Sequence, residues 1–170
     1  MAVVMPDVVL LAALAATGLR VVMLQNRVHT LEEQAITDPL TGAFNRRHME
    51  ATLDAVVERS RRTVERASLL LLDVDRFKDI NDACGHGAGD RVLKGLVALI
   101  EQRKRKADVL FRAGGEEFVL LLSGTRFGEA LSVAEDLRCR VQNTQLLAGR
   151  PVSISIGVVE LAREIGRAHV

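Results

Sequence analysis

Two glycines followed at once by two acidic residues, Gly114-Gly115-Glu116-Glu117, form the most informative stretch of the chain. The glycines allow a positive φ and let a large ligand approach the backbone. Apolar runs flank the stretch on both sides, which predicts two strands joined by a hairpin turn. The tip of such a hairpin presents carboxylates beside bare backbone, an arrangement that suits a metal ion bound to phosphates. Taken alone, the stretch fits an ordinary turn with solvated acids equally well.

A second carboxylate, Asp73, follows the apolar run 68–72, which we expect to be a fully buried strand. Ligands of α/β sheets bind outside the carboxyl ends of strands, so Asp73 and Glu116 can meet at one rim of the sheet. Mg²⁺ is typically held by one or two carboxylates together with substrate phosphates. A pair of such ions can activate a hydroxyl and hold the leaving phosphates. A capping or turn role for Asp73 remains the alternative.

Polar residues beyond Asp73 extend the possible site. Lys78 can reach a phosphate as a point charge. Asn81 and Asp90 offer acceptors for the edge of a guanine, which carries a ring N–H and an exocyclic amine. Each has a simpler interpretation as a surface lysine, a turn residue or a helix N-cap. His86, between two glycines, is expected to be a loop histidine.

Composition argues against a nucleic-acid-binding function. The net charge is +1, and the 170 residues include five Phe but no Trp or Tyr. Modules that bind single strands need aromatic platforms on which bases stack. The basic run 103–106 lies at an expected helix C-terminus, where it complements the helix dipole. We therefore expect no nucleic-acid partner.

The elements expected to position these residues alternate between helix and strand. Because they interleave, they predict one compact α/β domain with a hairpin in its sheet. Their expected ranges are a basic amphipathic helix 45–65, the strand 68–72 leading to 73–75, a short polar helix or loop 76–84, a helix 89–104, the hairpin 108–122, a helix 127–143 and a strand 152–159.

The N-terminal residues 1–24 carry only two charges, Asp7 and Arg20. As a helix they would reach about 36 Å, against a hydrocarbon core of about 30 Å. We therefore expect a transmembrane helix, and the basic residues after it predict an inner-membrane protein whose remainder faces the cytoplasm. A signal peptide is disfavoured by Asp7, and a helix of a soluble core is the other alternative. Apolar spacing predicts a coiled-coil-like linker over 25–37, ended by the Asp38-Pro39 pair.

From Asp38 onward the chain resembles the GGDEF domain, the diguanylate cyclase module. The resemblance implies an α+β, nucleotidyl-cyclase-like palm, in which helices flank a central, mainly antiparallel sheet and a helix precedes it. Its motifs occur in order: Asp-Pro-Leu-Thr-Gly at 38–42, Asn-Arg-Arg at 45–47, Leu-Asp-Val-Asp-Arg-Phe-Lys at 72–78, Asn-Asp-x-x-Gly-His-x-x-Gly-Asp at 81–90, Arg-Ala-Gly-Gly-Glu-Glu-Phe at 112–118 and Val-Ser-Ile-Ser-Ile-Gly at 152–157.

The resemblance implies that two GTP condense into cyclic di-GMP and two pyrophosphates across a homodimer, with Mg²⁺ or Mn²⁺ assisting attack by a 3′-hydroxyl. It also implies a product-inhibition site at Arg105 and Asp108, because the family's Arg-x-x-Asp motif precedes the first signature glycine by the same interval. The roles implied by position are metal ligands for Asp73, the Val74 carbonyl and Glu116, and support for the metal and the attacking hydroxyl for Glu117. The residues implied in substrate binding are Phe77, through its backbone, and Lys78 at the phosphates; Asn81 and Asp90, with His86 nearby, at the guanine; and Gly114 and Gly115.

The chain departs from the family pattern in two places. Ala113 replaces a larger residue, which predicts looser packing near the loop. The domain, 38–163, is expected to be incomplete, because the family continues with a phosphate-binding helix and a final strand. Residues 164–170 read like a translated sequencing adapter and are expected to be a non-native tail. Two other functions stay open: a degenerate domain that binds GTP or cyclic di-GMP without turnover, and a related cyclase with another product.

Overall fold

The computed structural model describes residues 14–15, 17–25, 36–62 and 66–161. Contacts divide the chain into two units, Met1–Ala35 and Ile36–Val170. In the first unit, residues 14–15 and 17–25 are helical. Most of the coiled-coil-like linker predicted at 25–37, and the tail predicted at 164–170, lie outside the described residues.

The predicted membrane helix is corrected by the structure. Of the helices that the structure describes, none is long and apolar enough to cross a membrane. The prediction of a single-pass inner-membrane protein anchored by residues 1–24 is therefore wrong.

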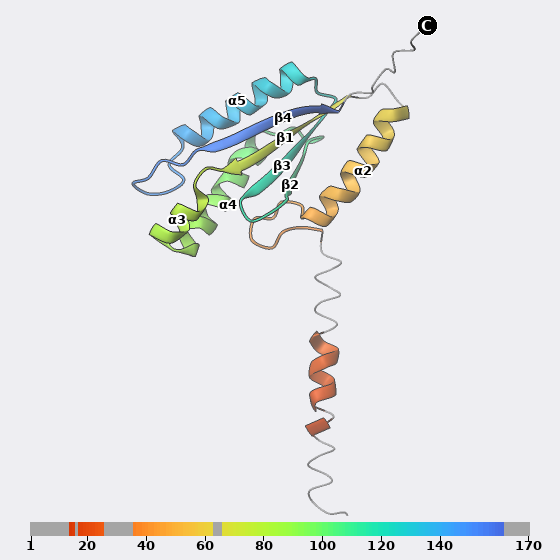
Figure 1. The fold of residues 1–170 in the computed structure, drawn as a ribbon, viewed down its shortest axis with the longest axis vertical. Helices are drawn as coiled ribbons and strands as arrows, with labels where there is room; N and C mark the ends of the chain where they lie inside the picture. Colours follow the sequence, from red (N-terminus) through yellow and green to blue (C-terminus); the bar gives the residue numbers. More distant parts are fainter. Residues whose placement is uncertain (1–13, 16, 26–35, 63–65, 162–170) are drawn as a thin grey trace, which may run out of the picture. The chain divides into compact units, whose positions relative to one another are not determined.

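The second unit alternates helices and strands as the sequence predicts (Figure 1). Its elements in chain order are α2 (Arg46–Arg62), β1 (Ala67–Val74), α3 (Phe77–Cys84), α4 (His86–Arg103), β2 (Val109–Arg112), β3 (Glu117–Ser123), α5 (Phe127–Asn143) and β4 (Ile154–Leu161).

The four strands form one sheet in the order β2-β3-β1-β4, and each neighbouring pair is antiparallel. β1 is central, with the β2–β3 hairpin on one side and β4 on the other. This arrangement of helices around an antiparallel sheet confirms the predicted α+β class. The antiparallel pairing also places the C-terminal end of β1 next to the start of β3, where the hairpin tip lies, and next to the start of β4.

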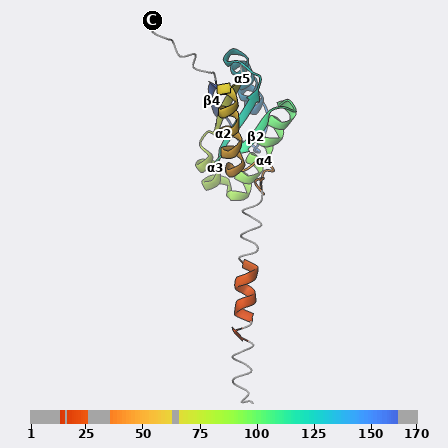
Figure 2. The same ribbon diagram turned by 90° about the vertical axis from the view of Figure 1, so that its right-hand side faces the viewer.

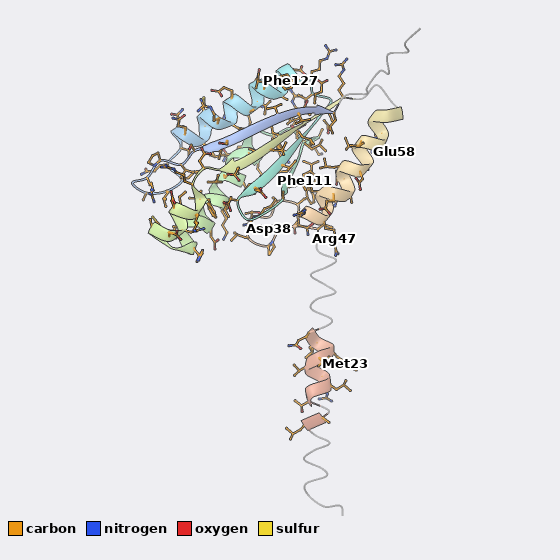
Figure 3. The ribbon with its side chains drawn as sticks, in the orientation of Figure 1. Met23, Asp38, Arg47, Glu58, Phe111 and Phe127 are labelled. Carbon is orange, nitrogen blue, oxygen red and sulfur yellow. The ribbon has the colours of Figure 1, made fainter. Side chains whose placement is uncertain are left out.

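Helices cover the two faces of the sheet unequally (Figures 1 and 2). Alternate β1 residues, Leu70 and Leu72, join the larger core with α4 and α5. On the other face, Phe111 and Val119 pack with Met49 of α2 in a smaller cluster, and Figure 3 shows Phe111 beside that helix. The sheet face under α2 is therefore covered by the smaller of these two hydrophobic clusters.

Two details differ from the expected elements. Leu71 is 49% exposed, so β1 is not the fully buried strand that its apolar run predicted. α4 begins at His86 rather than near residue 89, so His86 opens a helix instead of lying in a loop. Of the nearby glycines only Gly85 has a positive φ, 79°, and Gly87 and Gly89 continue the helix.

Candidate functional site

Two carboxylates meet where β1 and β3 come together. The register pairs Asp73 of β1 with Glu117 of β3. Side chains alternate between the faces of a strand, so Asp73 shares a face with Leu71, and Glu117 shares it with Val119. That face is the one that carries α2. The hairpin therefore delivers an acidic residue to Asp73, but the residue directly opposite is Glu117, whereas the sequence analysis named Glu116.

Burial and the neighbouring acids both act on the pKa of Asp73. Partial desolvation, followed by the negative charges of Glu117 and Asp75, raises the pKa of Asp73 above the ordinary carboxyl value. Crowded carboxylates favour a bound cation, because a cation relieves their mutual repulsion. Among the described residues no three His, Cys, Asp or Glu side chains form a ready-made metal centre. A carboxylate pair of this kind fits an ion whose remaining ligands come from a substrate.

The structure places the two hairpin acids differently. Glu117 opens β3 opposite Asp73, whereas Glu116 lies one residue earlier, in the turn, and is half-buried. Gly114 lies against Glu117, because a Cβ added there would collide with Glu117 Oε2. Gly115 has open space around it. The first glycine thus makes room for an acid of the site itself, and the second leaves its backbone accessible.

Arg112 holds this hairpin in place, a role that the sequence analysis did not assign. Its guanidinium donates to the carbonyls of Gly114 (3.2 Å) and Gly115 (2.7 Å) and to Asp38 Oδ1 at 2.8 Å. Asp38 Oδ1 also accepts from the Thr41 hydroxyl at 2.6 Å and the Thr41 N–H at 2.9 Å. The opening motif of the domain is therefore tied directly to the glycine turn; Figure 3 marks Asp38.

Burial acts to raise the pKa of Asp38, but hydrogen bonds from Thr41 and Arg112 outweigh it and hold the pKa below the ordinary value. The Asp38–Arg112 pair joins residues far apart in the sequence, so periodicity gives no sign of it. Two local features of the sequence could have suggested the pair. Asp38 lies shortly before a Thr-Gly turn, and Arg112 lies just before two glycines.

A hollow of about 350 Å³ adjoins the acidic pair under α2. Asp73, Glu117 and Leu71 line it from the sheet, and Met49 lines it from the helix. Ala113 also lines it, beside the hairpin tip.

The turn between β1 and α3, residues 75–76, follows Val74, the residue after Asp73. Arg76 adopts a left-handed conformation, with φ 54°, and no side chain caps the helix that Phe77 begins. The first N–H groups of a helix need partners, and they attract anions when no side chain supplies them. Phe77 is buried and Lys78 is exposed. This helix start can therefore accept an anion, and the exposed Lys78 follows its first residue.

The two residues predicted to read guanine lie on packed helices, Asn81 on α3 and Asp90 on α4. Within the described part of the chain, Asn81 Oδ1 is buried and has no hydrogen-bond partner. A Cβ on Gly89 would collide with this oxygen and come within 2.9 Å of the Phe77 ring. A buried amide without a partner is costly unless a ligand completes it. His86 is exposed at the start of α4.

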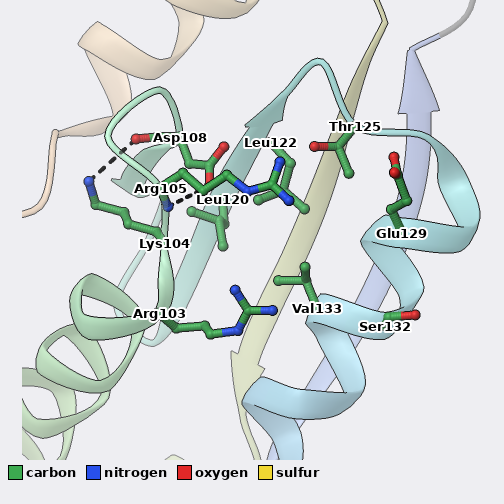
Figure 4. A pocket seen from close by; sticks show the side chains of 10 residues that line it. All are labelled: Arg103, Lys104, Arg105, Asp108, Leu120, Leu122, Thr125, Glu129, Ser132 and Val133. Carbon is green, nitrogen blue, oxygen red and sulfur yellow. Dashed lines mark hydrogen bonds between the residues drawn. The ribbon is translucent and has the colours of Figure 1, made fainter.

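A separate pocket of about 250 Å³ contains the predicted inhibitory residues (Figure 4). Asp108 is 5% exposed, and its Oδ2 accepts from the Arg105 backbone N–H at 2.8 Å. Its other oxygen, Oδ1, is buried with no partner among the residues that the structure describes. Arg103 and Lys104 also line the pocket, which gives it a basic rim for an anionic ligand.

Comparison with known proteins identifies the family to which the chain belongs. Residues 35–168 match the family model described as "Diguanylate cyclase, GGDEF domain". The chain is 40% identical over 146 residues to "Response regulator PleD" of Caulobacter vibrioides, covering 83% of this chain and 32% of that protein. It is 43% identical over 128 residues to "Diguanylate cyclase DgcM" of Escherichia coli K12, covering 75% and 31%. The chain thus spans about a third of the length of these curated relatives.

Solved structures show the same fold. The diguanylate cyclase SiaD of Pseudomonas aeruginosa, crystallised with its activator SiaC, matches with a TM-score of 0.70 and 39% identity over 91% of this chain and 61% of that one. The coiled coil and GGDEF domain of DgcB from Caulobacter crescentus, crystallised with cyclic di-GMP, matches with a TM-score of 0.71 and 25% identity over 89% and 82%. The chain belongs to the GGDEF family of diguanylate cyclase domains.

Proposed function

We propose that this chain acts as a diguanylate cyclase, which condenses two GTP molecules into cyclic di-GMP and releases two pyrophosphates. The observation that carries the proposal is the pairing of Asp73 with the acidic hairpin of Glu116 and Glu117 at one end of the sheet. The family match supplies the substrate class.

In this proposal, Asp73, the Val74 carbonyl and Glu116 hold Mg²⁺ or Mn²⁺, and Glu117 supports the metal and the attacking group. The metal ion supplies charge stabilisation for the transferring phosphate and lowers the pKa of the attacking 3′-hydroxyl. Two carboxylates with open coordination positions are the donor set that Mg²⁺ uses with nucleotides.

The protein's own groups orient the nucleotide. The N–H groups at the start of α3 and the Lys78 ammonium face the phosphates, and Asn81 with Asp90 pairs with the guanine edge. The buried, unpartnered Oδ1 of Asn81 supports this role, because a guanine N–H would complete it. Each domain holds one GTP, so product forms only when two chains face each other as a homodimer.

Incubation of the full chain with GTP and Mg²⁺, followed by mass analysis of the nucleotides, tests the proposal. We expect cyclic di-GMP, with a rate that rises more than linearly with protein concentration. Tight GTP or cyclic di-GMP binding without turnover would favour the degenerate binding module, and a different cyclic product would indicate a related cyclase.

Replacing Gly89 with alanine is expected to raise the KM for GTP roughly 10-fold or more. The added Cβ would displace the Asn81 amide, and an overpacked site of this kind costs about 1–3 kcal/mol. Steady-state kinetics against GTP concentration measures the effect. Gly87→Ala is the matched control, because its Cβ meets nothing within 4 Å and alanine suits a helix. Equal KM values for the two variants would count against the guanine site.

We also propose that the pocket around Arg105 and Asp108 binds cyclic di-GMP and inhibits the enzyme. Arg105→Ala is expected to raise the inhibitory concentration of cyclic di-GMP roughly 10-fold or more, because the substitution removes a charge-assisted contact to the ligand. The fold should be unaffected, since Asp108 accepts from the Arg105 backbone rather than its side chain. Inhibition curves at fixed GTP measure this, with the uninhibited rate as the internal control. An unshifted curve would contradict the assignment.

A further inference from the structure

Asp75, the second acid after β1, has both carboxylate oxygens engaged by hydroxyl groups. Ser153 Oγ donates to Asp75 Oδ2 at 2.6 Å, and Ser155 Oγ donates to Asp75 Oδ1 at 2.6 Å. These lengths are typical of charge-assisted O–H···O⁻ bonds, which are about twice as strong as neutral ones. Although Asp75 lies two residues from Asp73, its oxygens are thus directed to Ser153 and Ser155, at the start of β4, and not to the carboxylate pair.

The backbone of Asp75 is fixed to the same segment. Its N–H donates to the Ser153 carbonyl at 3.1 Å, which continues the β1–β4 ladder beyond the end of β1. A planar trans peptide directs its N–H and its C=O to opposite sides. The peptide unit that carries this N–H also carries the Val74 carbonyl, so that carbonyl points away from β4. Because β1 lies between β4 and β3, the carbonyl is directed toward the side of the acidic hairpin.

The serines lie where they can control this geometry. Ser155 is paired with Asp73, and Ile154 is paired with Val74, so the two hydroxyls lie beside the end of β1. The residue after Asp75, Arg76, has a φ of 54° and starts the turn into α3. A rotation of the Asp75 peptide would therefore move both the Val74 carbonyl and the helix start.

We propose that Asp75 is a positioning residue that, through Ser153 and Ser155, holds the Val74 carbonyl in the direction from which it binds the metal ion. The inference rests on the proposed cyclase function and deepens it. It adds three residues to the site that do not touch the substrate, and it assigns the second acid of the Asp-Val-Asp motif a role other than metal ligand.

A pair of isosteric double variants tests the proposal. Ser153→Thr with Ser155→Thr keeps both hydroxyls, whereas Ser153→Val with Ser155→Val removes them at nearly constant shape. Both serines are exposed, and both replacements suit a strand. Mn²⁺ affinity of the full chain, in the presence of the α,β-methylene analogue of GTP, is measured by electron paramagnetic resonance of the free ion. The valine variant should bind Mn²⁺ about 10–100-fold more weakly, as when supporting partners of metal ligands are removed, and the threonine variant should bind like the wild type.

Kinetics give a second readout. In the valine variant kcat should fall while the KM for GTP stays constant, and thermal unfolding midpoints should agree between the two variants. Equal Mn²⁺ affinity in the valine and threonine variants would overturn the inference. Tighter Mn²⁺ binding in the valine variant would also overturn it, because it would mean that the serines keep Asp75 away from the metal ion. A wild-type chain that binds no Mn²⁺ with the analogue overturns the proposed function as well.

Discussion

Asp73→Asn is expected to lower kcat for cyclic di-GMP formation by roughly 10²–10³-fold, the loss seen when one preorganised electrostatic group is removed. Asparagine has nearly the same shape but no charge to bind the metal ion. Because Asp73 is paired with Glu117 at the junction of β1 and β3, the remaining carboxylate cannot recreate the pair. Product formation at saturating GTP and Mg²⁺ measures the effect.

The same substitution should leave the metal-free protein as stable as the wild type, or more stable. Desolvation and then the charges of Glu117 and Asp75 raise the pKa of Asp73, so its ionised form destabilises the fold at neutral pH. That penalty is present above the folded-state pKa and disappears as the pH falls below the unfolded value of about 3.9. Any gain in the unfolding midpoint of the variant should therefore be present at pH 7 and vanish in acid.

Asp54→Asn is the matched control for this prediction. It makes the same chemical change at an exposed position of α2, and its kinetics should equal those of the wild type. If Asp73→Asn kept more than half of the wild-type rate, Asp73 would not be a metal ligand. If both variants lost activity together, the effect would be one of net charge.

Arg112→Lys is expected to reduce activity about 10–100-fold, as when a group that orients a metal ligand is lost. The unfolding free energy should fall by roughly 1–3 kcal/mol, because a partly buried acceptor loses its partner. The Arg112 guanidinium spans Asp38 and the carbonyls of Gly114 and Gly115, which a single ammonium cannot do. Chemical denaturation and cyclase assays on the same preparation measure the two losses.

Arg91→Lys, on the exposed surface of α4, controls for the change of cation. Asp38→Asn removes the other half of the pair. Because the folded-state pKa of Asp38 is lowered, its contribution is fully present above the unfolded value and is lost as the pH falls through the folded one. The stability deficit of Asp38→Asn should thus be present at pH 7 and shrink in acid. A deficit that did not change with pH would show that the charge of Asp38 contributes nothing.

Local patterns predicted most of the secondary structure. The helix expected at 127–143 has those bounds as α5, because Gly124 breaks the chain before it and apolar periodicity is maintained throughout. α4 begins three residues before the expected start at residue 89, because only Gly85 among the nearby glycines has a positive φ, and Gly87 and Gly89 continue the helix. Leu71 was expected to be buried, since the sequence does not reveal that the sheet face under α2 is thinly covered.

Long-range contacts were harder to predict from the sequence. A glycine-acid hairpin and a strand-ending aspartate suggested one site, and the sheet brings them together. Which of the two hairpin acids lies opposite Asp73 depends on the register, and the structure pairs it with Glu117. The link from Arg112 to Asp38 and the serine bonds to Asp75 join distant segments, so neither periodicity nor spacing indicates them.

The central position of β1 has a consequence for folding kinetics. Asp73 finds Glu117 through the β1–β3 pairing and Ser155 through the β1–β4 pairing, and both pairings join segments far apart in the sequence. Closing long loops before such contacts form slows folding, and mixed topologies fold more slowly than helical bundles. The metal-binding end of the sheet should therefore assemble in a late step, when β4 docks. Capture of Mn²⁺ during refolding would then report the completion of the native topology rather than early collapse.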